Sequence, residues 1–544
     1  MNVSAEGLAG HMKWWGWGEP DKRNELADGA KAMLREELGA AEPVEPVAKE
    51  DVRLPGAQEI PQAVRSAVGA DAVLTGDEDR LLRSGGKSYP DLHRARTGAL
   101  ETAPDAVLLP ASAGEVASVL AACAAESVAV VPFGGGTSVV GGVDAVRGSH
   151  RAVIALDLAR MRDCEVDRVS MTARLGPGLR GPAAEAALLE NGLTIGHFPQ
   201  SFEFATIGGF AATRSAGQAS AGYGRFDELV TAIEMVSPSG TLRTLDTPHT
   251  AAGPALREVV VGSEGTLGVI TDVTVRVRPA PRKKHYRGWM AEDFEAGAEI
   301  VRELAHADAL PDVTRLSDPE ETRISLAMSG MEGFKKSAFE SYLRMRGRTG
   351  GCMLITGWEG EAEDVERRRG ISSRILRSNG AVSLGTAPGK AWAHGRFEGP
   401  YLRDELMSLG YFVETLETSH TWSRYHELYN AVRGALRGAM EAAGTPGIVM
   451  CHLSHAYRDG ASLYYTFIAP SKPGAELEHW RALKSAACDA IVATDGTITH
   501  HHAVGRDHAP YMQAEVGEVG LEALRALKER LDPAGIMNPG KLLP

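Results

Sequence analysis

The sequence predicts an α+β protein with more than one domain. Its 544 residues exceed the length at which a single hydrophobic core usually stops growing. From Pro104 to Gly136, strand-like and helical patterns alternate and end in a glycine-rich loop. After the prolines and charges of 279–284, helical and strand-like stretches alternate again, which predicts a separate α+β domain.

Residues 1–100 are predicted to form an N-terminal helical and linker region. This stretch is charged and irregular, with a helix expected over Lys22–Leu38 and a proline-rich linker over Pro43–Pro61. The chain does not start with basic residues followed by an apolar run, and no window approaches about 18 uninterrupted apolar residues. We therefore expect neither a secretory signal nor a membrane span.

A strand, a helix and a second strand precede the first glycine-rich loop. Val107–Pro110 is the first expected strand, and Ser112 with Glu115 forms the pattern of a helix capping box. The helix that follows carries four apolar side chains at helical spacing on one face: Val116, Val119, Leu120 and Cys123. The apolar run Val128–Val131 is the second expected strand, and it leads directly into the loop.

The predicted first domain, residues 101–280, contains two more glycine-rich stretches, at 196–224 and 261–271. Its other expected elements are strands at Ile154–Leu158 and Val169–Ala173, a helix from Pro182 to Gly192, and an alternating strand through Val273, Val275 and Val277. Three glycine-rich loops within one span of alternating strands and helices predict a domain that surrounds an extended ligand.

The second domain is predicted over residues 281–495, followed by a C-terminal segment, 496–544. Expected elements are helices at Phe294–Ala307 and Ser423–Ala443, and strands at Met353–Thr356 and Ser462–Ile468. In the C-terminal segment an amphipathic helix is expected over Leu521–Leu531, ending at Asp532-Pro533 because the residue before a proline disfavours helical geometry.

The loop Pro132–Val143 presents bare backbone N–H groups that suit an anion. Glycine permits positive φ and lets the backbone approach a phosphate closely. The spacing is not G-x-G-x-x-G, because Val139 stands where the third glycine would be, and no Lys-Ser/Thr pair follows. The donors therefore suit an intact pyrophosphate better than a transferred phosphate, which needs lysine and Mg²⁺. Taken alone, the loop is better explained as a surface turn, so other segments must decide.

The composition excludes several classes of function. A net charge of −13 argues against nucleic acid as a partner, because phosphate backbones are bound by an excess of lysine and arginine. The five cysteines lie far apart without C-x-x-C spacing, so neither a disulfide framework nor a zinc site is indicated. A reducing, cytoplasmic location fits this pattern.

Four motifs occur in order along most of the chain: Pro132–Ser138, Thr206–Gly209, Gly262–Thr271 and the closing Leu531–Lys541. Together they resemble the FAD-binding proteins of the vanillyl-alcohol oxidase and p-cresol methylhydroxylase superfamily. The resemblance implies a two-subdomain FAD-binding domain and an α+β cap domain with an antiparallel sheet. It also implies FAD as the cofactor. The loop has no histidine or cysteine where relatives attach FAD covalently, so we expect non-covalent binding.

Within that superfamily, Gly196–Gly209, Leu416–Trp422 and the histidine run in Thr499–Gly505 resemble the alkyldihydroxyacetonephosphate synthase family. That family exchanges the acyl chain of an acyl-dihydroxyacetone phosphate for a long-chain alcohol, which forms an ether with no net redox change. The implied partners are a lipid phosphate and a fatty alcohol. The resemblance also favours a homodimer, and a lipid substrate makes peripheral contact with a membrane plausible.

The resemblance implies catalytic roles for Tyr464, Arg403 and the three histidines His500, His501 and His502. Tyr464 matches the family's proposed acid/base, and as a free tyrosine it would need nearby cations to act as a base at neutral pH. The histidines could supply those cations, although on an extended strand His500 and His502 share one face and His501 points away. Arg403 suits a phosphate or a departing carboxylate because its guanidinium binds either one bidentately.

The resemblance also implies the residues that lie near FAD. They are Pro132, Gly134, Gly135, Gly136, Thr137, Ser138, Gly141, Gly142, His197, Pro199, Ser201, Thr206, Gly208, Gly209, Thr213, Ser215, Glu264, Gly268, Ile270 and Arg315. The sequence departs from the family pattern after the histidine run. The eukaryotic members have lysines there, which this chain lacks, and Arg506 is the candidate replacement. No metal is expected, and the alternative is a metal patch formed by the run with His452 and His455.

Two other functions remain open from the sequence. An FAD-linked 2-hydroxyacid dehydrogenase or oxidase, of the D-lactate or glycolate type, would share the fold. Those relatives carry a His-x-Gly-Asp-Gly-Asn-x-His segment, whereas the corresponding stretch here is Cys451–Tyr464 without that pattern. The third possible function is a flavin-binding scaffold or sensor without catalysis. The retained Tyr464, arginines and histidines argue against it.

Overall fold

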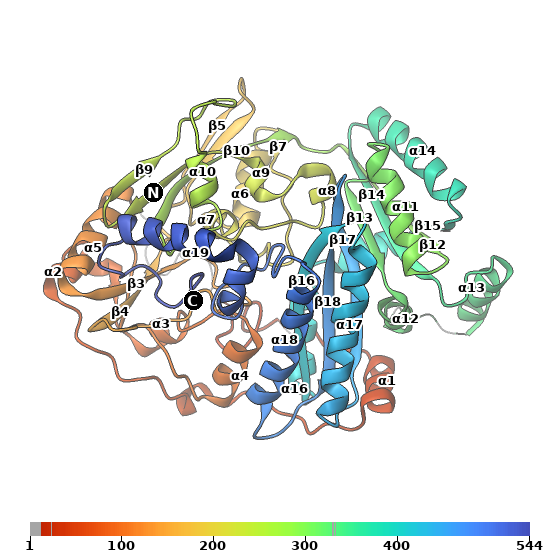
Figure 1. The fold of residues 1–544 in the computed structure, drawn as a ribbon, viewed down its shortest axis with the longest axis horizontal. Coiled ribbons are helices and arrows are strands. Elements are labelled where there is room, and N and C mark those ends of the chain that lie inside the picture. Colours follow the sequence, from red (N-terminus) through yellow and green to blue (C-terminus); the bar gives the residue numbers. More distant parts are fainter. Residues whose placement is uncertain (1–11, 23, 329–330, 332) are drawn as a thin grey trace.

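The computed structural model describes residues 12–544 except 23, 329–330 and 332. It has three main β-sheets with helices packed around them (Figure 1). The two smaller sheets lie on one side of the molecule and a seven-stranded antiparallel sheet lies on the other. The predicted α+β class with an antiparallel cap sheet is confirmed.

The first sheet has the order β1 (Val73–Leu74), β2 (Ala106–Leu108), β4 (Ala152–Asp157) and β3 (Val128–Phe133). Strands β2, β4 and β3 are parallel, and α5 (Ala113–Glu126) connects β2 to β3. Ser112 caps this helix by accepting a hydrogen bond from the Glu115 N–H at 3.2 Å. The buried face of α5 consists of the four residues that its spacing predicts.

The second sheet is antiparallel, with the order β5 (Cys164–Asp167), β6 (Thr172–Leu175), β10 (Val269–Arg276), β8 (Val230–Ser237) and β9 (Gly240–Arg243). Helices α6 (Gly181–Leu189), α7 (Ile207–Ala212) and α10 (Leu256–Val260) share its hydrophobic core. The strand predicted at Val169–Ala173 begins later, at Thr172. Asp167 Oδ1 accepts the N–H groups of Val169 and Ser170 and forms a turn there, which leaves Val169 96% exposed.

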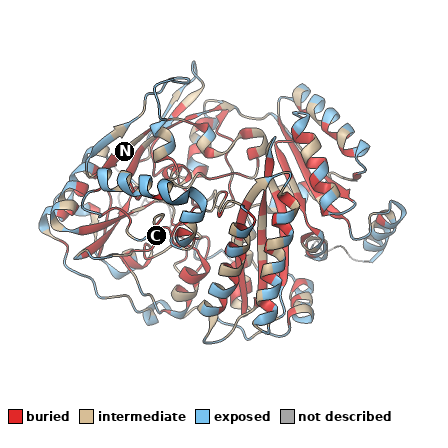
Figure 2. Cartoon of the chain, in the orientation of Figure 1, coloured by how far each residue is buried: buried red, intermediate tan, exposed pale blue. Residues whose placement is uncertain are grey.

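The third sheet has seven antiparallel strands. Their order is β15 (Val382–Gly385), β12 (Lys283–Ala291), β14 (Cys352–Gly360), β13 (Val313–Ser317), β17 (Ile448–Ala456), β18 (Gly460–Pro470) and β16 (Tyr411–Thr421). Helices α11 (Phe294–His306), α14 (Ala362–Ser378), α17 (Tyr425–Ala442) and α18 (Glu476–Ala493) share the core on its outer face. Their solvent sides are exposed, whereas the strands behind them are buried (Figure 2).

The inner face of this sheet is turned toward the two smaller sheets. Around it lie α1 (Asp28–Leu38), α12 (Pro319–Met328), α15 (Ala387–Gly395) and α16 (Gly399–Ser408). Helix α1 starts at Asp28 rather than at the predicted Lys22, with an acidic residue in its first turn where the helix dipole favours negative charge.

The C-terminal residues complete the first sheet. After α19 (Met512–Leu531), which is broken at Gly517, the chain returns to β3. Val130 N–H donates to the Ile536 carbonyl, and Asn538 N–H donates to the Val130 carbonyl, both at 2.8 Å. The Asn538 side-chain amide donates to the carbonyls of Gly142 and Glu264 at 3.1 and 2.7 Å. This contact joins the first and third glycine-rich stretches.

The remaining helices are short, apart from the exposed α13. They are α2 (Gln62–Arg65), α3 (Asp77–Leu81), α4 (Tyr89–Thr97), α8 (Ser220–Tyr223), α9 (Phe226–Leu229) and α13 (Gly333–Met345). Two short strands, β7 (Leu193–Thr194) and β11 (Arg278–Pro279), pair antiparallel with each other. Within the described ranges, we find no helix that is both long and apolar enough to cross a bilayer. The first eleven residues of the predicted N-terminal region lie outside the described residues. The predicted domain limits stay predictions.

Candidate active site

A large cavity lies between the glycine-rich loops and the inner face of the seven-stranded sheet. Its volume of about 500 Å³ is usual for a cofactor or substrate site. Most of the residues predicted for the site line it: Pro132, Gly134, Gly135, Gly136, Thr137, Ser138, Gly142, Pro199, Ser201, Thr206, Gly208, Gly209, Thr213, Ser215, Glu264, Gly268, Ile270, Arg315, Arg403, Tyr464, His501 and His502.

The first glycine-rich loop forms one wall of this cavity with its backbone. A Cβ atom on Gly134 would lie 2.4 Å from Thr206 Oγ1, and one on Gly135 would lie 2.1 Å from the Phe204 carbonyl oxygen. Gly136 takes φ +65°, which disfavours other residues. These positions therefore need glycine, because the loop packs directly on the second glycine-rich stretch.

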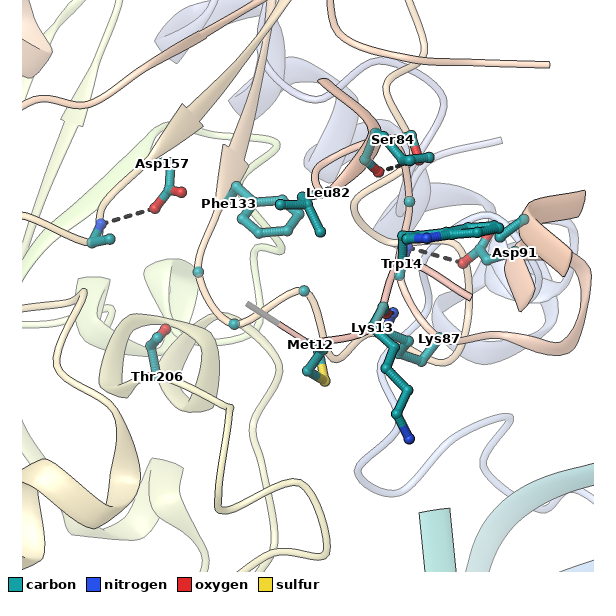
Figure 3. Close-up of a pocket in the computed structure, with 18 of the residues that line it drawn as sticks. Met12, Lys13, Trp14, Leu82, Ser84, Lys87, Asp91, Phe133, Asp157 and Thr206 are labelled. Atoms are coloured by element: carbon teal, nitrogen blue, oxygen red, sulfur yellow. Dashed lines mark hydrogen bonds between the residues drawn. The ribbon is translucent and has the colours of Figure 1, made fainter. Parts of the chain in front are cut away.

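A second, smaller cavity of about 110 Å³ borders the other side of the same loop. Figure 3 shows Met12, Lys13 and Trp14 beside it, with Phe133 and Thr206 on the loop side. Gly134, Gly135 and Gly136 line both cavities, so the loop backbone is the wall between them.

The large cavity fits the chemistry of FAD. Bare N–H groups of the loop and the hydroxyls of Thr137 and Ser215 provide neutral donors for a pyrophosphate. Within the described part of the chain no lysine lines the wall, and its two arginines, Arg315 and Arg403, come from the cap domain. Apolar side chains such as Leu158 and Ile270 provide surfaces for aromatic rings.

At the opposite wall, Tyr464 and two arginines face the cavity. Tyr464 lines the cavity from β18, whereas the next residue, Tyr465, is fully buried on the outer face and donates to the Tyr429 carbonyl. Arg403 donates to the Lys87 carbonyl at 2.7 Å, and its Nε has no partner among the described residues. Arg403 lines the cavity, and its Nε is buried within the wall.

Arg315 is already engaged within the protein. It donates to Glu321 Oε1 at 2.7 Å and lies 3.0 Å from His452 Nδ1. Despite burial, His452 and Arg315 together hold the pKa of Glu321 well below its usual value. This ion pair fixes Arg315 at the cavity wall with its charge largely balanced.

The histidine run bends around one buried carboxylate. We call residues Thr499–Gly505 the histidine segment. Glu417, on β16, accepts the N–H of His500 at 2.6 Å, of His501 at 2.8 Å and of His502 at 2.7 Å, and the Thr499 hydroxyl at 2.6 Å. Of the two geometries open from the sequence, extended or bent, the segment takes the bent one. Three successive N–H groups point to one side, which a strand does not permit.

The bend separates the three histidines. His501 and His502 line the cavity, whereas His500 lies behind it and stacks on His455 with ring centroids 5.1 Å apart. His501 Nδ1 lies 3.3 Å from Glu417 Oε2. The run therefore presents two imidazoles to the cavity and keeps the third in the protein interior.

Burial keeps most of this cluster neutral. It lowers the pKa of His502 to about 3 and lowers the pKa of His500 and His455 well below the usual value. Burial also raises the pKa of Tyr464, and the charges of Arg403 and Arg315 oppose that rise. The expectation that the whole run supplies cations to Tyr464 is therefore wrong. The arginines carry the positive charge that faces this hydroxyl.

Three predicted residues lie outside the cavity wall. His500 is one, and His197 is another, since it is buried against Phe210 and Phe226 with its Nε2 3.0 Å from Ser215 Oγ. Gly141, the third, contacts the side chain of Arg506. Arg506 itself pairs with Asp144 at 2.7 Å and does not line the cavity, so it does not replace the missing lysines there.

Glu264 lines the cavity, but its carboxylate accepts hydrogen bonds from the protein backbone. It accepts the N–H groups of Val504 and Gly505 at 2.8 and 2.7 Å. Burial raises its pKa to about 7 although these two hydrogen bonds oppose the rise. Glu264 thus fixes the end of the histidine segment beside the glycine-rich loops.

Sequence reasoning missed Glu417 and Glu321. Both are buried carboxylates on elements of the cap, and each holds predicted residues in place. Glu417 lies within the quoted Leu416–Trp422 motif, and a glutamate on the buried side of a strand is a signal because charge is costly there. Its partners, 83 to 85 residues later in the chain, carry no matching signal.

The metal alternative depends on His455, His500 and His501. Their ligand atoms all lie within 4.8 Å of one another. However, His500 Nδ1 and His501 Nδ1 face each other at 3.0 Å, and His500 Nε2 lies 2.7 Å from the Tyr457 hydroxyl. These rings are engaged as hydrogen-bonding partners, so we favour that role over metal ligation.

The wall of glycine-rich loops and the sheets around it define an FAD-linked enzyme. Residues 104–246 match the family model of the FAD binding domain, and residues 280–542 match the C-terminal domain of FAD linked oxidases. The alkyldihydroxyacetonephosphate synthase of Dictyostelium discoideum is 33% identical over 473 residues, which cover 86% of this chain and 77% of that protein. The chain belongs to the alkyldihydroxyacetonephosphate synthase family, as its motifs predict.

Solved structures share this fold, and a further relative is similar in sequence. An alkyldihydroxyacetonephosphate synthase structure, 28% identical, matches 97% of this chain and 99% of its own with a TM-score of 0.82. A p-cresol methylhydroxylase structure matches 88% of this chain and 95% of its own with a TM-score of 0.65. The sequence identity is 17%, so this match shows the shared fold. A glycolate oxidase subunit of Bacillus subtilis is 27% identical over 86% of this chain and 96% of its own.

Proposed function

We propose that the protein is an alkyldihydroxyacetonephosphate synthase-like transferase that uses FAD. It would exchange the acyl chain of acyl-dihydroxyacetone phosphate for a long-chain alcohol. The observation that supports this most is that one cavity combines a polar wall around Tyr464 with a long apolar wall. A small 2-hydroxyacid would need the first wall but not the second.

The apolar wall comes from the helices α1, α12 and α16 and from the strands β16, β17 and β18. Leu26 lies just before helix α1, Leu34 comes from the buried face of α1, and α12 contributes Ile324. The other apolar residues of this wall are Ala30, Met33, Met328, Leu402, Leu406, Val413, Met450 and Ile468. Such a surface suits an aliphatic chain, because each buried methylene contributes about 0.8 kcal/mol.

The polar wall supports distinct roles for its residues. Arg403, which lines the cavity, would bind the phosphate or the departing carboxylate. Tyr464 would move the proton of the substrate carbon, and the neutral His502, whose ring centroid lies 5.3 Å from that of Tyr464, would help to orient the substrate. Bound oxidised FAD would supply an electrophilic centre at this wall. In the exchange the bond from carbon to the acyl oxygen breaks, the fatty acid leaves and the alcohol oxygen bonds to that carbon.

The purified protein tests the proposal directly. Its visible spectrum should show FAD that acid releases, because binding is proposed to be non-covalent. Incubation with acyl-dihydroxyacetone phosphate and labelled hexadecanol should give a labelled ether lipid. If no ether forms and D-lactate or glycolate bleaches the flavin, the protein is a 2-hydroxyacid dehydrogenase or oxidase instead.

Replacing Tyr464 by phenylalanine tests the acid/base role. We expect Tyr464→Phe to keep its flavin and lose ether formation by about 100-fold or more, the usual contribution of general acid–base catalysis. Tyr465→Phe is the matched control, because it removes a hydroxyl one residue away on the outer face. Undiminished exchange by Tyr464→Phe would refute the role. The homodimer, the cytoplasmic location and peripheral membrane contact stay predictions.

A further inference from the structure

Behind His501, a chain of hydrogen-bonding groups leads away from the cavity. His501 lines the cavity and its Nδ1 lies 3.0 Å from His500 Nδ1. The other nitrogen of His500, Nε2, lies 2.7 Å from the Tyr457 hydroxyl. His500 is therefore linked through both ring nitrogens, one toward the cavity and one toward Tyr457. Neither His500 nor Tyr457 lines the cavity.

The chain can hold its protons in two ways. In one, Tyr457 donates to His500 Nε2 and His500 Nδ1 donates to His501. In the other, His501 Nδ1 donates to His500 and His500 Nε2 donates to Tyr457. Both arrangements keep the two contacts of His500, because a neutral imidazole has one donor and one acceptor, and the second also turns the His501 Nδ1 proton toward Glu417 Oε2, 3.3 Å away. They differ by one proton shift along each bond, which is the property that a proton relay requires.

The surroundings favour passage of a proton over its storage. Burial lowers the pKa of His500 and raises the pKa of Tyr457, so both groups stay neutral at rest. The Glu417 carboxylate, 3.9 Å from His500 Nδ1, offsets a transient positive charge. At the far end, Tyr457 is partly exposed and lies beside the Arg225 guanidinium, which pairs with Asp227. The titratable groups that face this chain are Glu417, His455, His502, His452, His197, Tyr464, Arg225 and Asp227.

We propose that His501, His500 and Tyr457 form a proton relay between the cavity and solvent. The proton that Tyr464 takes from the substrate carbon would pass on to His501 while another leaves Tyr457 to water, so the relay itself gains and loses nothing. This proposal rests on the proposed exchange reaction. It also assigns a function to His500, which lies outside the cavity wall and packs behind His455 and His501.

The experiment measures two products of one reaction. The substrate carries tritium at the carbon whose proton is moved, and the alcohol carries ¹⁴C. For the FAD-bound Tyr457→Phe variant, we expect release of tritium to water to fall at least fivefold relative to ether formed. Tyr411→Phe is the control, because its hydroxyl bonds to the Gly39 carbonyl away from the relay, and both rates should match wild type. An unchanged ratio in Tyr457→Phe overturns the relay.

A second measurement separates this proposal from the exchange reaction. If the wild-type protein forms no ether, the proposed function fails, and the relay is judged from ring N–H exchange in ¹⁵N-histidine protein. Exchange of the His501 and His500 ring protons with D₂O should slow at least fivefold in Tyr457→Phe and stay unchanged in Tyr411→Phe. Equal rates in wild type and Tyr457→Phe would overturn the relay whatever the reaction is.

Discussion

Two buried glutamates hold the histidine segment, one at each end, and they differ in charge behaviour. Glu417 accepts the N–H groups of residues 500–502, and Glu264 accepts those of Val504 and Gly505. Yet the pKa of Glu417 is held well below its usual value, whereas the pKa of Glu264 is raised to about 7. Both are fully buried, so burial alone does not explain the difference.

The difference shows how much nearby side chains matter to a buried carboxylate. Glu417 also faces the imidazole of His501 at 3.3 Å, and this contact is the main influence that lowers its pKa against the effect of burial. Among the described residues, Glu264 has no cationic side chain in contact, and its two backbone donors do not offset its lost hydration. Glu417, at the Thr499–His502 end, is therefore negative at neutral pH, whereas the pKa of Glu264, at the Val504–Gly505 end, lies close to neutral pH.

The two carboxylates have opposite effects on stability as the pH changes. Glu417 has a depressed pKa, so its stabilisation is present above about pH 4.5 and is lost as the pH falls. Glu264 has a raised pKa, so its contribution is present below about pH 4.5 and is lost as the pH rises through about 7. Substitutions at each end test this contrast separately.

The largest effect is expected from Glu417→Gln. The amide offers one acceptor and turns an N–H₂ group toward donors, so the bend of the histidine segment should loosen. We expect a loss of about 3–5 kcal/mol in the free energy of unfolding, the cost of breaking a buried charged pair. Ether formation should fall by about 100-fold, because small misplacement of catalytic groups costs that much. Denaturant unfolding measures the loss of stability, and the labelled-alcohol assay measures the loss of ether formation.

Glu414→Gln is the matched control for this change. Glu414 is equally buried on the same strand, but its carboxylate accepts from the Trp480 indole on another side of β16. Its substitution should leave ether formation within a few-fold of wild type. If Glu417→Gln and Glu414→Gln reduce activity equally, the histidine segment does not depend on Glu417 in the way its contacts indicate.

A smaller effect is expected from Glu264→Gln, and it should depend on pH. Between pH 4.5 and about 7, the unfolded chain has released the Glu264 proton and the native protein still binds it. Wild-type stability should therefore fall relative to the variant by about 1.4 kcal/mol per pH unit, or roughly 3 kcal/mol in total. Unfolding with saturating FAD, measured from pH 5 to 8, checks this. Parallel curves for the two proteins would contradict the raised pKa.

The smallest effect is expected between the two glutamates, at Ala503. This residue takes φ +74°, a left-handed conformation that costs a non-glycine residue about 1–2 kcal/mol. Ala503→Gly should stabilise the protein by about 1 kcal/mol and leave both glutamate contacts in place. A shift of the melting temperature upward with unchanged ether formation is the expected result, and a lower melting temperature would show that the strain is absent.

The features that the sequence predicted well depend on local signals. The glycine positions Gly134–Gly136, the Ser112 cap and the buried face of α5 each follow from residues close together in the chain. The motif resemblance added the family and most of the cavity wall. Tyr464 faces the cavity and Tyr465 does not because strand residues alternate, which needs no tertiary information.

What the sequence could not predict depends on contacts between distant segments. The bend of the histidine segment requires Glu417 from another strand, and the neutral state of its histidines requires the burial of the whole cluster. In the sequence, Arg506 is the candidate replacement for the family's lysines, but its side chain pairs with Asp144 and does not line the cavity. Tyr457 belongs to no quoted motif, and only its distance to His500 draws attention to it.

The return of the C-terminal residues to β3 has a consequence for how the protein is made. Val130, Gly142 and Glu264 are translated early, but their partners Ile536 and Asn538 follow only after the entire cap. Contacts of such high sequence separation form late, because a long loop must close first. A nascent chain that has finished its glycine-rich loops therefore still lacks the donors that join them. Stable capture of the flavin should then be a final step of biogenesis, and fragments that end before Ile536 should be poor flavin binders.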